Sequence, residues 1–398
     1  MAEHVPSRRE TLKQSRVPTP ILILGFIFVA GIGYVAGALS GQLPNGFNSL
    51  IGKDQLDLSS VQATYQAVAD NFDGDVDEAK LVEGANRGLV DALGDQYTVY
   101  MNKKESTDFD DSLSGNIGGG IGVELSLRNG LPTVVRVLRD NPAEKAGVAV
   151  NDIVTAVNGE SVKDKSTTEI VTKIRGDAGT TVKLSVLREV ETKDFTITRE
   201  EVNNPSVYGS VVNGVGVMTI SRFDGETGGL ARKLATEFKA AGVKGVVLDL
   251  RGNGGGYVTA AQEVGGIWLD KQVVVTEKRS GKVTDELKSG GSPILNGVPT
   301  VVLINSSSAS ASEIVAGALH DHKAATLMGE KSFGKGSVQK LVGLSEGTML
   351  KVTVARWYTP SGLNISEKGI TPDTIVVRTI DDINASRDPQ LDAAKASF

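Results

Sequence analysis

The segment around residues 303–339 constrains the fold more than any other part of the chain. An apolar run, VPTVVLIN, leads into it and is typical of a buried strand, and a serine-rich turn follows that run. From Ser312 onward apolar residues recur at helical spacing, with Glu313 in the first turn of the predicted helix. A buried strand that passes through a short turn into a helix indicates a mixed α/β core.

The serine-rich turn holds a candidate nucleophile, because the N–H groups at a helix start can meet developing negative charge. A serine run is more often a solvated loop, and a serine also needs a base to take its proton. The chain has no cysteine, and its histidines are His4, His320 and His322. A helix rises about 1.5 Å per residue, so His320 would lie roughly 15 Å from the turn. This distance disfavours a Ser-His-Asp triad.

A lysine could serve as the base, because burial disfavours its charged form and lowers its pKa. Lys335 lies between Gly334 and Gly336, where the backbone can approach another element closely. Composition alone leaves the base open between Lys331 and Lys335. It also leaves the nucleophile open among five serines: Ser306, Ser307, Ser308, Ser310 and Ser312. Of these, Ser312 is better placed as the helix N-cap.

Two motifs in this segment, SASASEI and SFGKGSVQ, together resemble the paired signature of the C-terminal processing peptidases. These are serine proteases with a Ser-Lys dyad and a PDZ domain. The resemblance implies that Ser310 is the nucleophile, Lys335 the general base and Gln339 the residue that orients the lysine. If Lys335 and Gln339 share a helical turn, their spacing puts both side chains on one face. The family resemblance also implies a crotonase/ClpP-like α/β protease core.

The sequence DLRGNGGG, residues 249–256, is the second chemical element. Its consecutive glycines, between a predicted strand and helix, allow backbone N–H groups to point into a cleft. The loop lacks the GxxxxGK[ST] pattern of a phosphate-binding P-loop. It resembles the family pattern DLRxNPGG, with Gly254 in place of proline. By that resemblance, the N–H groups of Gly255 and Ala311 would form the oxyanion hole.

Residues 117–202 consist of short predicted strands and glycine turns and resemble a PDZ domain, which binds a peptide C-terminus as an added strand. The run AGVAVNDIVTAVNG, residues 146–159, favours this interpretation over a simple hairpin. The resemblance implies these peptide-binding residues: Gly120, Ile121, Gly122, Val123, Ile170, Ile174 and Arg175. For Ile170 and Ile174 the sequence does not separate a place in the groove from one in the core beneath it. Arg175 is also a candidate for linking the bound peptide to the core.

The N-terminal part predicts a membrane anchor. Residues 21–39, ILILGFIFVAGIGYVAGAL, are uncharged and long enough to cross a bilayer, and basic residues precede them. We therefore expect a cytoplasmic N-terminus at 1–19, a transmembrane helix or uncleaved signal at 20–41, and an extracytoplasmic catalytic body on the cell membrane. A cleaved signal peptide is the alternative, because AGA at 36–38 resembles a cleavage site.

The remaining regions complete the predicted organisation. Residues 54–112 show helical periodicity and resemble a structural or docking region of the family, in which ALGDQYTVYMNKKE matches a DPYSxY-like motif. Residues 203–398 alternate strands and helices and form the predicted protease core, with DPQLDAAKA in the tail as a surface helix.

Composition and motifs narrow the function further. A formal net charge of −6 gives no reason to expect nucleic acid as a partner. The chain has neither HExxH nor cysteine pairs, so we expect no metal and no cofactor. Expected partners are protein or peptide substrates with exposed C-termini, the membrane, and a second copy of the chain or an adaptor protein.

The resulting prediction is a membrane-anchored serine endopeptidase that recognises substrate C-termini through its PDZ domain. One alternative is a catalytically inactive, membrane-tethered PDZ scaffold. Another is an acyl-CoA enzyme, because glycine-loop oxyanion holes also serve thioesters. Reaction of the serine with a covalent serine-directed probe separates the peptidase from the scaffold.

Overall fold

The computed structural model describes residues 56–366 and 368–398. The predicted cytoplasmic segment 1–19 and the predicted membrane segment 20–41 therefore lie outside the described residues. Within the described ranges, no helix is both long enough and apolar enough to cross a membrane. The chain divides into two compact units, Met1–Glu78 and Ala79–Phe398.

The first unit contains one described helix, α2 (Ser59–Asn71), which buries none of its side chains. The hydroxyl of Tyr65 on this helix donates a hydrogen bond to Oε1 of Glu78 at 2.7 Å. α3 (Glu78–Asp91) begins at the boundary between the units. The helical periodicity predicted for this region is confirmed in both helices.

The second unit opens with α3, a short strand β1 (Val99–Met101) and the helix α4 (Lys103–Ser114). The side chain of Asn102 accepts the N–H of Glu105, whose carboxylate accepts the N–H of Asn102 in return, and this capping box begins α4. β1 pairs antiparallel with β18 (Met349–Tyr358). The segment after α3 is thereby built into a sheet of the core.

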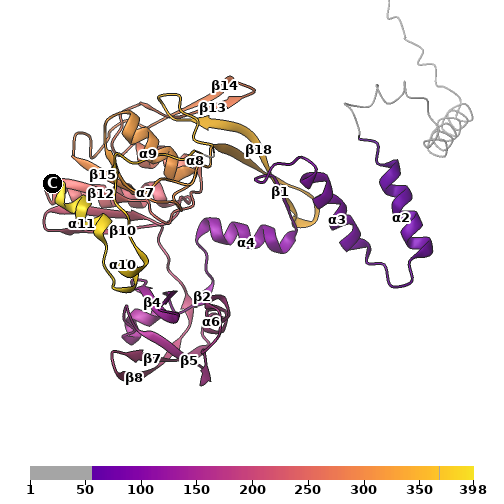
Figure 1. Ribbon diagram of the computed structural model, residues 1–398, viewed down its shortest axis with the longest axis horizontal. Helices are drawn as coiled ribbons and strands as arrows, with labels where there is room; N and C mark the ends of the chain where they lie inside the picture. The colour runs from indigo at the N-terminus through magenta and orange to yellow at the C-terminus, as the bar shows by residue number, and fades with distance from the viewer. Residues whose placement is uncertain (1–55, 367) are drawn as a thin grey trace, which may run out of the picture. The chain divides into compact units, whose positions relative to one another are not determined.

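Residues 119–201 form a separate β-rich layer around its own apolar core, and Figure 1 shows it in magenta tones. Its main sheet has the order β3-β4-β5-β7-β8, with β6 paired to β5. Ile121, Val134, Ile170 and Leu184 are among its fully buried side chains. Its elements are β2 (Gly119–Gly120), β3 (Val123–Arg128), β4 (Leu131–Val137), α5 (Pro142–Ala146), β5 (Ile153–Val157), β6 (Glu160–Ser161), α6 (Thr167–Ile174), β7 (Thr181–Arg188), β8 (Glu191–Thr198) and β9 (Glu200–Glu201).

The core is built on a six-stranded sheet of order β10-β11-β12-β15-β16-β19, in which only the β10–β11 pair is antiparallel. Alternate residues of β12 face opposite sides: Val246 and Leu248 pack with α7, α8 and α9, whereas Val247 packs with α11. Figure 1 shows α11, in yellow, beside this sheet. The elements are β10 (Val207–Val212), β11 (Val215–Ile220), α7 (Thr227–Ala240), β12 (Gly245–Asp249), α8 (Val258–Gly265), β15 (Thr300–Ile304), α9 (Ala311–Asp321), β16 (Thr326–Gly329), β19 (Thr374–Ile375), α10 (Ile380–Asn384) and α11 (Pro389–Ala396).

A second sheet has the order β1-β18-β13-β14, and β17 also pairs with β18. It adds β13 (Val273–Arg279), β14 (Lys282–Lys288) and β17 (Ser337–Gly343), and a 3-10 turn, η2 (Ser345–Gly347), joins β17 to β18. Because Gln339 lies in the strand β17, the expectation that Lys335 and Gln339 share a helical turn is wrong. The mixed α/β prediction for the protein is confirmed.

Candidate active site

Ser310 occupies a strained corner between β15 and α9. The helix begins at Ala311 with Ser310 as its N-cap residue, and Ser310 has φ 55° and ψ −115°. A residue other than glycine rarely adopts this backbone conformation, which persists only where the surroundings enforce it. The prediction of Ser312 as N-cap is wrong: Ser312 is buried in the first turn, and its hydroxyl donates to the carbonyl of Asn253 at 2.9 Å.

The carboxylate of Glu313 joins this corner to the lysine loop. It is fully buried, and Oε2 accepts the N–H of Ser310 at 2.9 Å and that of Lys335 at 3.0 Å. Oε1 accepts the hydroxyl of Ser332 at 2.6 Å and the N–H of Gly334 at 2.7 Å. Burial raises the pKa of this carboxyl, and the four hydrogen bonds act in the opposite direction. One side chain therefore fixes the backbone at both candidate residues.

Hydrogen bonds hold the backbone of Lys335 at both its N–H and its carbonyl. Its N–H donates to Glu313, and its carbonyl accepts the indole N–H of Trp357 at 2.8 Å. Its Nζ lies 5.7 Å from the centroid of the Tyr97 ring, and no described carboxylate forms an ion pair with it. Burial lowers the pKa of Lys335, the ammonium of Lys351 lowers it further, and Glu313 partly opposes this shift. A lowered pKa favours the neutral amine that a general base requires.

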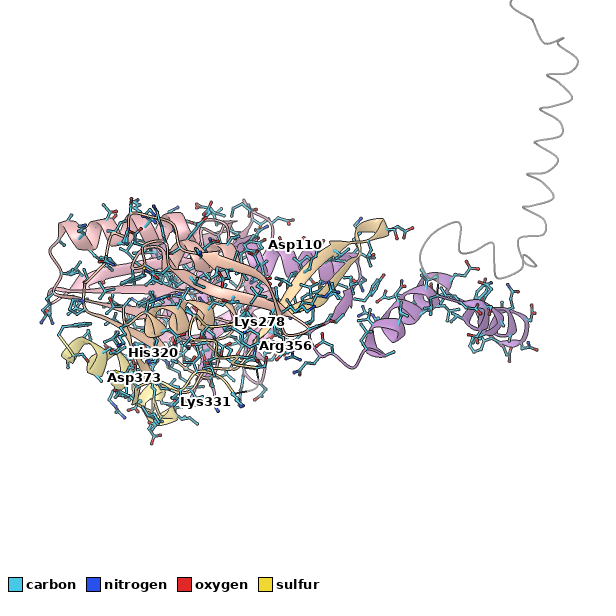
Figure 2. All side chains as sticks on the ribbon, turned by 90° about the horizontal axis from the view of Figure 1, so that it is seen from above. Asp110, Lys278, His320, Lys331, Arg356 and Asp373 are labelled. Atoms are coloured by element: carbon cyan, nitrogen blue, oxygen red, sulfur yellow. The ribbon has the colours of Figure 1, made fainter. Side chains whose placement is uncertain are left out.

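The other candidate bases lie elsewhere. Nε2 of His320 is 3.1 Å from Oδ1 of Asp373, and these two residues lie together in Figure 2. Nε2 of His322 is 2.7 Å from the carbonyl oxygen of Val273. His4 lies outside the described residues. Lys331, labelled in Figure 2, is exposed. It is not among the residues that line the cavity around Ser310.

A cavity of about 630 Å³ brings four of the predicted site residues together. Its lining includes Gly255, Ser310, Lys335 and Gln339. The amide of Gln339 donates to the hydroxyls of Ser337 at 2.8 Å and Thr353 at 3.3 Å. Gln339 thus shares the cavity with Lys335, but its hydrogen bonds in the described structure go to the two hydroxyls.

The glycine loop lies directly against Ser310. A Cβ atom at Gly255, where φ is 104°, would come within 2.7 Å of Cβ of Ser310, so only glycine fits. The N–H of Gly255 donates to Oδ1 of Asn253 at 2.9 Å. The N–H groups of Ala311, Gly254 and Gly256 have no acceptor within the described part of the chain. Of the two predicted oxyanion donors, Ala311 is therefore unengaged, whereas Gly255 is bonded within its own loop.

Arg251 connects this loop to the C-terminal helix. Its guanidinium donates to both carboxylate oxygens of Asp249 at 2.9 and 2.6 Å and to both of Asp388 at 2.8 and 2.9 Å. It also donates to Oε1 of Gln390 at 2.9 Å. Burial lowers the pKa of Arg251, but the two carboxylates outweigh it and raise the pKa above its ordinary value. The tail, predicted as a surface helix, instead packs on the sheet through α11, with Ala394 buried.

Comparisons with known proteins show which family this chain belongs to. Peptidase family S41 matches residues 214–376, the PDZ domain family matches residues 119–198, and the N-terminal domain of the activating protease CtpB matches residues 44–105. A "Probable CtpA-like serine protease" from Staphylococcus haemolyticus strain JCSC1435 is 34% identical over 356 residues, which cover 89% of this chain and 71% of that protein. The chain belongs to peptidase family S41.

Further relatives agree with this assignment. A "Probable CtpA-like serine protease" from Staphylococcus aureus strain MSSA476 is 35% identical over 358 residues, with 89% of this chain and 71% of that protein covered. The structure of the photosystem II D1 C-terminal processing protease is similar with a TM-score of 0.51 and 29% identity, and covers 81% of this chain and 87% of that one. The protein is thus an S41 serine protease of the C-terminal processing type with a PDZ domain.

The PDZ domain of this S41 peptidase has a small apolar groove, a cavity of about 60 Å³. Its lining includes the predicted residues Gly120, Ile121, Gly122, Val123, Ile174 and Arg175. Ile170, which the sequence left open between the groove and the core beneath it, is not among the lining residues and packs in the domain core. Arg175 is exposed at the end of α6, where its N–H donates to the carbonyl of Val171.

Several residues around the S41 cavity were missed at the sequence level. Tyr97 and Phe109 belong to the region predicted as structural or docking, yet they lie beside the amino groups of Lys335 and Lys351. Glu313 could have been found from its spacing, because an acidic residue three positions after an N-cap serine is the capping-box pattern. No sequence pattern indicated Lys351.

Proposed function

We propose that Ser310 and Lys335 are the nucleophile and general base of this S41 peptidase. Three observations support the pair: Ser310 is strained at a strand-to-helix corner, both residues line one cavity, and Glu313 accepts a backbone N–H from each. The link through Glu313 carries the proposal, because one buried carboxylate fixes the backbone at both residues.

In the proposed reaction, neutral Lys335 takes the hydroxyl proton of Ser310 as Oγ attacks the scissile carbonyl. The N–H of Ala311 and an N–H of the glycine loop stabilise the oxyanion. The N–H of Gly255 can donate to the oxyanion once its hydrogen bond to Asn253 is released. The protonated lysine then gives its proton to the leaving amine. Water hydrolyses the acyl-enzyme, with Lys335 again as base. By the family resemblance Gln339 orients the lysine, and its amide donates a hydrogen bond to the hydroxyl of Ser337, two residues from Lys335.

The proposal extends to recognition and location. The groove around Ile121 and Ile174 is apolar, which suits an apolar substrate C-terminus whose carboxylate meets the glycine-rich turn. The uncharged run 21–39 would anchor the chain in the membrane, with residues 54–112, 117–202 and 203–398 outside the cytoplasm. The core would share the fold of the crotonase and ClpP group, and a second copy or an adaptor would regulate it.

Proteolysis of an unfolded protein substrate by the full-length chain tests the catalytic pair. Ser310→Ala and Lys335→Ala should each reduce cleavage by at least about 1,000-fold, as expected for residues that act as one unit. Ser306→Ala and Lys331→Ala remove an exposed serine and an exposed lysine from the same two loops, and both should cleave at the wild-type rate. Retained cleavage by either Ser310→Ala or Lys335→Ala would contradict the proposal.

A further inference from the structure

A second lysine, Lys351 on β18, lines the same cavity as Ser310 and Lys335. Its Nζ lies 5.4 Å from the centroid of the Phe109 ring of α4. No carboxylate in the described ranges forms an ion pair with it. Lys335 and Lys351 are thus the two partly buried lysines of the cavity lining, and no described carboxylate forms an ion pair with either.

The surroundings of Lys351 are those of an apolar residue. Its cross-strand neighbours are Val99 on β1 and Leu341 on β17, and its side chain is half-buried. Removing an ammonium from water without a paired anion costs free energy, which packing alone would not require at this position. Burial correspondingly lowers the pKa of Lys351. A methionine would fill the same space at lower cost.

Three other charged side chains line the cavity: Arg222, Glu277 and Lys340. Arg222 at the cavity wall pairs with Asp224 at 2.9 Å. Burial raises the pKa of Glu277, another lining residue, and the neighbouring Asp285 raises it further. Lys340 also lines the cavity but is exposed to solvent.

Two charges act on Lys335 in opposite directions. The carboxylate of Glu313, which accepts the N–H of Lys335, favours its protonated form, and the ammonium of Lys351 disfavours it. The ring of Tyr97 beneath the amine adds a further attraction for the cation. Lys351 is thus the described charge that opposes protonation of Lys335.

We propose that Lys351 is a positioning residue for the protease reaction, whose ammonium repels a proton from Lys335 and so keeps the general base neutral. The inference rests on the proposed role of Lys335 as base. Repulsion between two ammonium groups is mutual, so the pair favours a state with a single charge, and burial lowers the pKa of both lysines. We assign the neutral amine to Lys335, because Glu313 bonds the backbone N–H of this residue and that of Ser310. Lys351 remains charged while its neighbour becomes the base.

The test is the rate at which a fluorophosphonate labels Ser310 in the full-length protein, from about pH 6 to about pH 10, below the ordinary pKa of lysine. Lys351→Met removes the repulsion, so labelling at pH 7 should fall by at least about threefold and return to the wild-type rate at the alkaline end. Lys351→Arg keeps a charge at this position and should keep the wild-type pH profile. Lys331→Met removes an exposed charge outside the cavity and should also match the wild type.

An unchanged pH profile in Lys351→Met would overturn the inference. So would an equal loss at every pH, or a displaced profile in Lys351→Arg, because neither follows from the charge of Lys351. Failure of the underlying base assignment is distinguishable: Lys335→Ala would then label as fast as the wild type at neutral pH. If Lys351→Met does not fold, Lys351→Gln replaces it with the same expected profile.

Discussion

The active-site cavity and the PDZ groove are built in different ways. In the cavity, buried side chains from distant segments hold the reacting residues: Glu313 bonds the backbone at Ser310 and Lys335, and Trp357 bonds the carbonyl of Lys335. The PDZ groove is instead formed by a local glycine turn and apolar side chains such as Ile174. Catalysis needs fixed polar geometry, whereas strand addition needs an available backbone and an apolar surface.

This difference predicts that substitutions in the cavity have large effects on turnover and that substitutions at the groove have small effects, confined to recognition. A variant of the groove that abolished turnover would break the comparison. So would a variant of the buried cavity contacts that left turnover intact.

Among residues other than Ser310 and Lys335, the largest effect is expected for Gly255→Ala. The new methyl group would meet Cβ of Ser310 at 2.7 Å, on a backbone with φ 104° that alanine disfavours. Displacement of the oxyanion loop should lower kcat by about 100-fold or more. The control is Gly254→Ala, because a Cβ at Gly254 meets nothing within 4 Å. Steady-state cleavage of a peptide by both variants checks this, and equal rates would contradict the packing argument.

The next largest effect on turnover is expected for Glu313→Gln. Glutamine has the same shape but only one acceptor oxygen. Its NH2 group would replace the other oxygen and would face N–H groups that now donate to the carboxylate. We expect kcat to fall by about 100-fold and stability to drop by about 2–3 kcal/mol, measured by peptide cleavage and by urea unfolding. Ser332→Ala removes one of the four donors and should cost about 1 kcal/mol. A Glu313→Gln protein with wild-type activity would show that the link is dispensable.

A smaller effect is expected for Asp388→Ala. The change removes two hydrogen bonds from Arg251 and so loosens the glycine loop from the C-terminal helix. We expect a loss of about 1.5–3 kcal/mol in stability and about tenfold in kcat. Asp392→Ala on the same helix breaks only an exposed pair with Lys395 and should change stability by less than about 0.5 kcal/mol. Equal melting temperatures for the two variants would contradict this ranking.

The smallest effect is expected for Arg175→Ala. If Arg175 links a bound peptide to the core, stimulation by a C-terminal peptide should fall roughly two- to tenfold, while cleavage without the peptide stays the same. Lys173→Ala changes the same helix at a residue that pairs with Glu160, and it should keep full stimulation. Unchanged stimulation in Arg175→Ala would show that Arg175 does not link the bound peptide to the core.

Sequence patterns predicted the local features and missed the contacts between distant segments. The strand, the serine turn and the helix around Ser310 follow one another in the chain, so their order is visible in the sequence. The strand conformation of Gln339 depends on pairing with β18, which the local spacing does not show. The contact between Arg251 and Asp388 spans 137 positions and has no sequence signature.

Boundaries and burial were the other sources of error. The helix begins one residue before Ser312, and an error of one or two residues at a helix end is ordinary for reasoning from pattern. Ile170 and Ile174 have the same residue type on the same helix, and only the packed structure separates the core residue from the groove residue.

The most direct measurement is the pH dependence of fluorophosphonate labelling in the wild-type protein, with the modified serine located by mass spectrometry. The pKa of Lys335 is lowered by burial and by Lys351, and the base acts when neutral, so labelling should rise with pH through a midpoint below the ordinary lysine value of about 10.4. We expect this rise and modification at Ser310 alone. A rate that stays flat until lysines ordinarily titrate, or modification of another serine, would contradict it.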